Sequence, residues 1–276
     1  MSDEPTATTV GAGAGASPAE APAAAADLAW GLSNVEVRFG HRTALAGVSL
    51  RATAGAVVAV VGGDGAGKST LLRTLAGLRA PNAGRVMRPP ARDIGFVSAG
   101  AGVYVDLTVT ENLDFVAGAY GLRGARLETR AAPLLARAGL DGARDRLAGR
   151  LSGGMRQKLA FVLAVVHDPS LLVLDEPTTG VDPVSRADIW RLIAGAAASG
   201  AAVVMATTYL DEAERAANVL VLDDGRALAT GTPDEIVARL PGAAASTSGY
   251  PPPRLRPPVP QRRRASRPAL SPSPPT

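Results

Sequence analysis

A glycine-rich stretch, GGDGAGKST, has the residue types needed to hold a chain of phosphates. It fits the pattern G-x-x-x-x-G-K-[ST], with an apolar run before it and a helical pattern after it. Glycines let backbone N–H groups turn toward an anion, a helix start adds a positive dipole, and a lysine adds a point charge. A glycine turn that serves only packing is the alternative. We therefore predict a phosphate site formed by Gly62, Gly63, Asp64, Gly65, Ala66, Gly67, Lys68, Ser69 and Thr70.

Two carboxylates follow a second apolar run, LLVLDEP, and could complete such a site. Asp175 can hold Mg²⁺ together with the hydroxyl of Ser69, and Glu176 can orient or deprotonate an attacking water. The alternative is an ordinary pair of surface carboxylates. Their position at the end of so apolar a run, directly before Pro177, favours the chemical interpretation.

Strands and helices must position these residues, and the hydrophobic pattern of the sequence predicts several of them. Alternation in NVEVRF and continuous apolar runs elsewhere predict strands, and KSTLLRTLAG has helical periodicity. We expect the phosphate loop to follow the second strand. Helical patterns between the later runs indicate an α/β fold with a mainly parallel sheet. Residues 107–167 are expected to form a helical insertion. The runs expected to form further strands are AVVAVVGG, LLVLDEP, AAVVMAT and NVLVLDDG.

Composition excludes several classes of protein. The 276 residues include no cysteine, which excludes disulfides, thiolate metal sites and cysteine catalysis. No run of 18 or more apolar residues is present, so no transmembrane helix is expected. The net charge of +4 includes six arginines after Tyr250; without them, 23 basic residues face 25 acidic ones. The basic character therefore belongs to the tail, and we expect no nucleic-acid partner.

Both ends of the chain have low-complexity sequence. Residues 1–29 are rich in Ala, Gly and Pro, and residues 242–276 are rich in Pro and Arg. Such segments bury too little apolar surface to order themselves, so we expect disordered flanks around a structured domain at 30–241.

A third motif adds a family resemblance. LSGGMRQKLA, which begins at Leu151, resembles the signature of ATP-binding cassette (ABC) ATPases. LDEPTTGVDP is similar to their Walker B strand and D-loop, and TTYLDEAE to their switch region. The motifs occur in the family's order over about residues 30 to 240. The resemblance implies a P-loop NTPase (RecA-like) core with an N-terminal antiparallel β part and a helical signature subdomain.

The resemblance also implies roles for single residues and for partners. Phe39 matches the aromatic that stacks on adenine, and Asp182 matches the D-loop aspartate at a dimer interface. The signature residues cap the γ-phosphate held by the opposite subunit of a head-to-tail dimer, with ATP and Mg²⁺ as cofactors. The residues that match them are Ser152, Gly153 and Gly154.

Two positions depart from the family pattern. Thr208 stands where the family has a histidine that contacts the γ-phosphate, and Ala99 stands where it has a glutamine. Neither His41 nor His167 lies at a place in the chain that could replace the missing histidine. Loss of a positioned donor typically lowers the rate by about 10²–10³. We therefore expect ATP binding to survive and hydrolysis, with Glu176 and Thr208 as catalytic residues, to be slow.

The segments DLTVTENLDF, SGGMRQKLA and GVDPVSRADIW are similar to drug- and polysaccharide-export cassettes. The resemblance implies an ATPase subunit of an exporter that is cytoplasmic, peripheral on the inner face of the membrane, and bound there only through a separate permease. A second cassette, identical or different, would complete the dimer. The alternatives are a hydrolysis-deficient half of a heteromeric pair and a soluble non-transport ABC ATPase.

Overall fold

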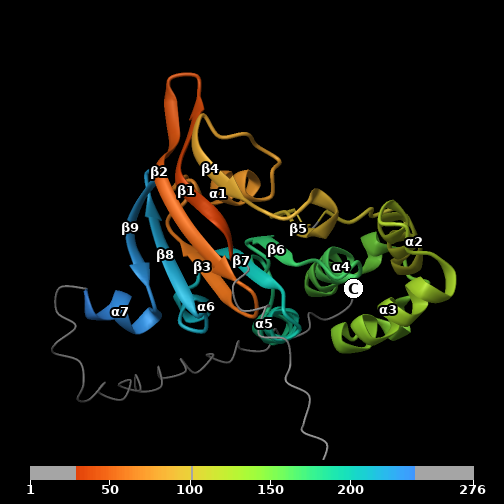
Figure 1. Cartoon of the computed structure of the whole chain (residues 1–276). Helices are drawn as coiled ribbons and strands as arrows, with labels where there is room; N and C mark the ends of the chain where they lie inside the picture. Colours follow the sequence, from red (N-terminus) through yellow and green to blue (C-terminus); the bar gives the residue numbers. More distant parts are fainter. Residues whose placement is uncertain (1–28, 101, 240–276) are drawn as a thin grey trace, which may run out of the picture. The chain divides into compact units, whose positions relative to one another are not determined.

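The computed structural model describes residues 29–100 and 102–239 (Figure 1). It contains nine strands within these residues, and the five segments predicted from the sequence correspond to β1, β3, β6, β7 and β8. The strands are β1 (Ala29–Phe39), β2 (Arg42–Thr53), β3 (Val57–Val61), β4 (Ala83–Met87), β5 (Ile94–Val97), β6 (Leu171–Asp175), β7 (Ala202–Thr207), β8 (Asn218–Asp223) and β9 (Arg226–Gly231).

Seven α-helices and short 3₁₀ turns connect these strands in the described residues. Three helices fall within residues 107–167, the part for which the sequence predicted a helical insertion. The helices are α1 (Lys68–Leu75), α2 (Val109–Ala119), α3 (Gly124–Ala138), α4 (Gly153–Val165), α5 (Pro183–Ala198), α6 (Leu210–Ala213) and α7 (Pro233–Ala238), with 3₁₀ turns at Ala91–Asp93, Asp141–Ala143 and Ala148–Arg150.

Two sheets organise the described residues. The larger has the order β5-β6-β7-β3-β8-β9, in which only the β8–β9 pair is antiparallel. The smaller is antiparallel, with the order β2-β1-β4. Helices α2, α3 and α4 gather beside the β5–β6 end of the larger sheet, and α7 lies near β8 and β9 (Figure 1). This mixed architecture agrees with the predicted fold class.

The central strands are apolar throughout because both faces of the sheet are buried. In β3, Val58 and Val60 belong to a core shared with the small sheet and α1, whereas Val57, Ala59 and Val61 belong to a core shared with α2–α5. Successive side chains of a strand point to opposite faces, so one short strand contributes to both cores. The ends of β3, β6 and β7 are thereby fixed at one edge of the sheet.

Two boundaries differ from the sequence prediction. β1 begins at Ala29, one residue before the expected start of the domain, and the rest of both predicted flanks lies outside the described residues. The phosphate loop follows the third strand and not the second, because β2 lies between β1 and β3. β2 reads RTALAGVSLRAT, and its Ala and Gly residues have low strand propensity, which hid it. No helix in the described residues has the length and apolar character needed to cross a membrane.

His167 connects α4 to β6 and lies half-buried at the end of the sheet opposite Asp175. Its ring stacks on Tyr120 with centroids 3.7 Å apart, and Nε2 lies 3.2 Å from the carbonyl oxygen of Ile94. Burial lowers the pKa of His167, against opposing effects of the Ile94 carbonyl and of Asp93 and Asp168. The folded state therefore favours the neutral ring.

We predict that acidification destabilises the fold through His167. A folded pKa below the unfolded one means that the unfolded chain binds more protons, so stability falls as pH drops through about 6.5 toward the folded value. Urea unfolding of the wild type and of His167→Phe, which keeps a stacked ring that cannot titrate, checks this. As the pH is lowered, the unfolding free energy of the wild type should fall relative to that of His167→Phe. A difference that is constant from neutral to acidic pH would contradict the prediction.

Candidate functional site

The phosphate loop spans the gap between the end of β3 and the start of α1. Gly67 has a φ of 105°, and a Cβ built there would lie 2.7 Å from the carbonyl oxygen of Ala44. Only glycine takes this backbone conformation without strain, and the close approach of β2 leaves no room for a side chain. The loop is thus held against β2, directly before the first residue of α1.

Lys68 is the first residue of α1, and its side chain is only 5% exposed. Its Nζ donates to the carbonyl oxygens of Gly62 at 2.9 Å and Gly63 at 3.1 Å, and lies 3.4 Å from Oε1 of Glu176. A buried ammonium is tolerated only when it is paired and hydrogen-bonded. The loop carbonyls and Glu176 meet that requirement and place the charge at the mouth of the loop.

Ser69 and Asp175 lie beside each other although 106 residues separate them in sequence. The Ser69 hydroxyl donates to Oδ1 of Asp175 at 2.9 Å, and Asp175 is 1% exposed. Burial raises the pKa of Asp175, and the hydrogen bond from Ser69 opposes that effect. The second oxygen, Oδ2, is buried without a partner in the described residues. A hydroxyl beside an unsatisfied carboxylate oxygen is a set of hard oxygen donors that fits Mg²⁺.

Glu176 follows β6 in a left-handed conformation, with a φ of 52°. Non-glycine residues in this region are strained and often belong to functional sites. Its backbone N–H donates to the carbonyl of Ala206 at 3.2 Å, and Thr179 Oγ1 donates to Oε2 at 3.2 Å. These contacts turn the carboxylate toward Lys68, away from the direction that an extended strand would give it.

Lys68, Ser69 and Glu176 line a pocket of about 390 Å³, whereas the predicted site residues Gly62, Gly63 and Asp175 are not part of its lining. Its wall includes Phe39, whose ring is about half exposed and carries the guanidinium of Arg79 at 4.1 Å on one face. The sequence analysis missed Arg42 and Ala44 in this wall. Their position just beyond Phe39, in the β1–β2 hairpin, is the signal that could have found them. The full lining is Phe39, Arg42, Ala44, Asp64, Gly65, Ala66, Gly67, Lys68, Ser69, Thr70 and Glu176.

Thr207, the last residue of β7, and Thr208, which follows it, have different environments. Thr207 is buried; its Oγ1 donates to Oε2 of Glu212 at 2.6 Å and accepts from the N–H of Tyr209 at 3.0 Å. Thr208 is exposed. Because Thr207 pairs with Val61 in the sheet, Thr208 follows at the edge from which the phosphate loop begins. Of the two side chains, that of Thr208 is the exposed one, although Thr208 is not among the residues that line the pocket.

The structure also places Ala99, the second position expected to depart from the family pattern, and the two histidines. Ala99 is exposed in the turn after β5 and offers no polar side chain. His41 is exposed in the turn between β1 and β2, and does not line the pocket. His167 lies at the opposite end of the sheet, so neither histidine substitutes for Thr208.

The signature residues lie apart from the pocket. Ser152 caps α4 by accepting from the N–H of Met155 at 3.2 Å. A Cβ on Gly154 would lie 2.5 Å from Oγ of Ser185, so α4 packs closely on the first turn of α5. Asp182 caps α5, and the hydrogen bond from the Ser185 N–H lowers the pKa of Asp182. Ser152, Gly153, Gly154 and Asp182 do not line the pocket with the phosphate loop.

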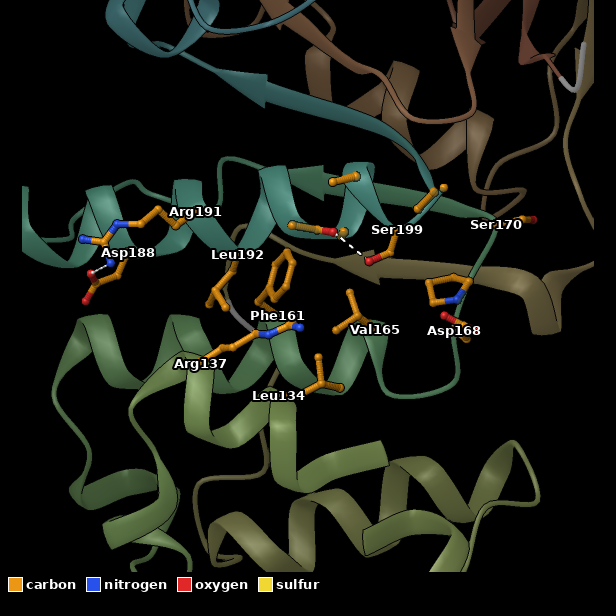
Figure 2. A pocket seen from close by; sticks show the side chains of 16 residues that line it. Leu134, Arg137, Phe161, Val165, Asp168, Ser170, Asp188, Arg191, Leu192 and Ser199 are labelled. Atoms are coloured by element: carbon orange, nitrogen blue, oxygen red, sulfur yellow. Dashed lines mark hydrogen bonds and ion pairs between the residues drawn. The ribbon is translucent and has the colours of Figure 1, made fainter. Parts of the chain in front are cut away.

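A larger cavity, of about 750 Å³, lies between α3, α4 and α5 (Figure 2). Phe161 and Val165 of α4 lie opposite Leu192 of α5, and Arg137 and Asp168 also line the cavity. Its lining includes no residue of the phosphate loop. The volume of a cavity therefore does not identify the reactive site here.

Comparison with known proteins links this geometry to one family. The ABC transporter family matches residues 45–179. The probable multidrug ABC transporter ATP-binding protein YbhF of Escherichia coli K12 is 38% identical over 223 residues, 76% of this chain and 39% of that protein. The daunorubicin/doxorubicin resistance ATP-binding protein DrrA of Streptomyces peucetius is 41% identical over 217 residues, 75% of this chain and 66% of that protein. The chain thus spans less than two thirds of either relative.

A third relative is covered more fully, and solved structures agree. Nod factor export ATP-binding protein I of Burkholderia lata is 36% identical over 215 residues, 74% of this chain and 71% of that protein. The structure of an ABC transporter ATP-binding subunit superposes with a TM-score of 0.70 at 29% identity, covering 76% of this chain and 92% of that one. The cassette MJ1267 in its ADP conformation gives a TM-score of 0.65 at 25% identity, covering 75% and 91%.

We predict that Lys68→Ala weakens nucleoside triphosphate binding by about 10- to 100-fold, the usual value of hydrogen bonds made by a charged group. Lys158→Ala is a matched control, because Lys158 is the only other lysine and pairs with Asp188 at 2.6 Å outside the pocket. Titration of each variant with a fluorescent ATP analogue measures the effect. Equal affinities of the wild type and Lys68→Ala would refute the phosphate site.

Proposed function

Because the chain belongs to the family of ABC transporter ATP-binding proteins, we propose that it binds and hydrolyses ATP to drive an exporter whose permease is a separate chain. The observation that carries this proposal is that Lys68, Ser69 and Glu176 line one pocket, and that the buried Asp175 accepts the hydroxyl of Ser69 directly behind it. The names of the relatives, which refer to multidrug transport, drug resistance and Nod factor export, support export as the direction.

In this proposal each group has a separate task. Backbone N–H groups of residues 62–67 and the Lys68 ammonium bind the β- and γ-phosphates, and Phe39 stacks on adenine. Ser69 and Asp175 would hold Mg²⁺, which neutralises charge that develops on the phosphates. Glu176 accepts a proton from water as the water oxygen bonds to the γ-phosphorus. The bond from that phosphorus to the β-phosphate oxygen breaks, giving ADP and inorganic phosphate.

The position of the signature supports a head-to-tail dimer. Ser152, Gly153 and Gly154 present a hydroxyl, glycine N–H groups and a helix start, which suit an anion. They do not reach the pocket of their own chain. A second cassette, placed with its pocket against this signature, would receive the missing cap on its γ-phosphate.

A second candidate function follows from the two substitutions. Thr208 is shorter than histidine and never cationic, and Ala99 is apolar, so the chain's own site is expected to turn over slowly. The signature and Asp182 are intact and would serve the other site. The chain would then be the nucleotide-binding half of a heteromeric pair whose partner cassette supplies most of the hydrolysis.

An exposed apolar patch of Tyr104, Val105 and Phe115 supports a permease partner. Phe115 is 58% exposed, and its ring contacts that of Tyr104 with centroids 4.8 Å apart. Exposed aromatic clusters often mark protein interfaces. The patch follows the turn that contains Ala99, the position at which the family's glutamine meets the permease.

We predict slow phosphate release from ATP by the wild type and loss of that release in Glu176→Gln. Thr208→His should raise turnover by about tenfold or more, because it restores a cationic donor beside the developing charge. A coupled phosphate assay with matched nucleotide saturation measures both. Wild-type turnover equal to that of Glu176→Gln would leave only the second candidate function.

We also predict that Phe115→Glu abolishes co-purification with a membrane permease encoded beside this chain. A carboxylate at the centre of the patch must be desolvated on binding, which an apolar interface does not compensate. Leu228→Glu is the matched control, because Leu228 lies on β9 outside the patch and is also exposed, at 65%. Retained co-purification of Phe115→Glu would place the permease contact elsewhere.

A further inference from the structure

Arg186, in the first turn of α5, contacts three residues of the short segment that follows β7, namely Tyr209 and, in α6, Asp211 and Glu212. Its Nη2 lies 3.2 Å from both carboxylate oxygens of Asp211 and 3.4 Å from Oε1 of Glu212. Its guanidinium carbon lies 3.8 Å from the ring centroid of Tyr209. The Arg186 side chain thus makes two ion pairs and a cation–π contact with the same short segment after β7.

Hydrogen bonds from the buried Thr207 also fix the segment after β7. Glu212 is 3% exposed, and its other oxygen accepts the hydroxyl of Thr207 at 2.6 Å. The same hydroxyl accepts the N–H of Tyr209, so Thr207 and Tyr209 are linked through one atom. Arg186 neutralises the buried Glu212 carboxylate, which would otherwise carry an uncompensated charge. The loop conformation therefore depends on Arg186.

Thr208 is the residue that this arrangement leaves free. It lies between Thr207 and Tyr209, both of which are fixed, and its own side chain is exposed. Residue 207 pairs with Val61 and residue 206 with Asp175, so Thr208 lies at the edge shared by the phosphate loop and the carboxylates. Its backbone position is set while its hydroxyl remains available.

Arg186 is also connected to the helix cap. Its backbone N–H donates to the carbonyl oxygen of Asp182 at 2.9 Å, one helical turn away. Asp182 in turn accepts the N–H groups of Val184 and Ser185. The residue that holds the loop after β7 therefore belongs to the same rigid turn as the D-loop residue.

We propose that Arg186 is a positioning residue that, through Tyr209, Asp211 and Glu212, fixes Thr208 to donate to the terminal phosphate of ATP. The proposal rests on the proposed nucleotide-binding function. A short, neutral donor has less reach than a histidine, so its backbone must be placed more tightly for its hydroxyl to reach an oxygen. Arg186 supplies that restraint, and it does not touch the nucleotide.

Equilibrium binding tests the proposal without requiring turnover. In a Glu176→Gln background with Mg²⁺, the ratio of the ADP to the ATP dissociation constant reports contacts made to the terminal phosphate alone. Thr208→Ala should lower this ratio about fivefold, the value of one hydrogen bond. Arg186→Met should lower it by a similar factor. The double variant should show no further loss, since both changes remove the same contact.

Arg191→Met is the matched control, because Arg191 is on the same helix but pairs with Asp188 at 2.9 Å. It should leave the ratio unchanged. Additive losses in the double variant, an unchanged ratio in Arg186→Met or Thr208→Ala, or equal losses for ATP and ADP would overturn the proposal. If Arg186→Met loses cooperative unfolding, Arg186→Lys replaces it, with a smaller loss expected because the charge remains and the planar stacking does not. Absent ATP hydrolysis in the wild type would count against the proposed enzyme function and leave this test intact.

Discussion

The ammonium group of Lys68 is nearly buried where β3 leads into α1, and its charge has to be compensated within a few ångströms. Two loop carbonyls and the Glu176 carboxylate provide that compensation. The carbonyls can converge only if the loop turns tightly, which requires Gly67 beneath Ala44. The carboxylate reaches Lys68 from a strained backbone. A phosphate chain supplies the same negative charge from outside, so the compensation that stabilises the free chain also prepares it for an anionic ligand.

At the end of β7, the buried Thr207 has a structural role, and the next residue, Thr208, is exposed. Thr207 is the last residue of β7 and is buried, so its hydroxyl needs partners, which are Glu212 and the N–H of Tyr209. Thr208 is the first residue after the strand, and its hydroxyl needs no protein partner because the side chain is exposed. The sequence alone identifies the pair but cannot assign these roles, because Arg186 reaches Asp211 and Glu212 only through tertiary packing.

The parts of the fold that the sequence predicted are those with a local signal. Continuous apolar runs predicted β3, β6 and β7 because strands buried on both faces need apolar residues throughout. β2 was not predicted, because Ala and Gly interrupt the alternation of apolar and polar residues and its pairing with β1 includes bulges. In the site, motif spacing predicted Lys68 and Asp175. Arg42 and Arg186 carry no motif, and their roles depend on which elements pack together.

The signature and D-loop residues pack together, apart from the residues that line the phosphate pocket. The signature helix packs through Gly154 on Ser185, within the same turn of α5 that begins at Asp182 and includes Arg186. Signature, D-loop and the loop of Thr208 are therefore one packed unit, whereas the phosphate pocket is lined by other residues. In the proposed function, threonine at position 208 would weaken the chain's own site, whereas the exposed Ser152 and Gly153 would still be able to serve the site of a partner. In a head-to-tail pair, a weakened own site and an intact contribution to the partner's site are thus compatible in one chain.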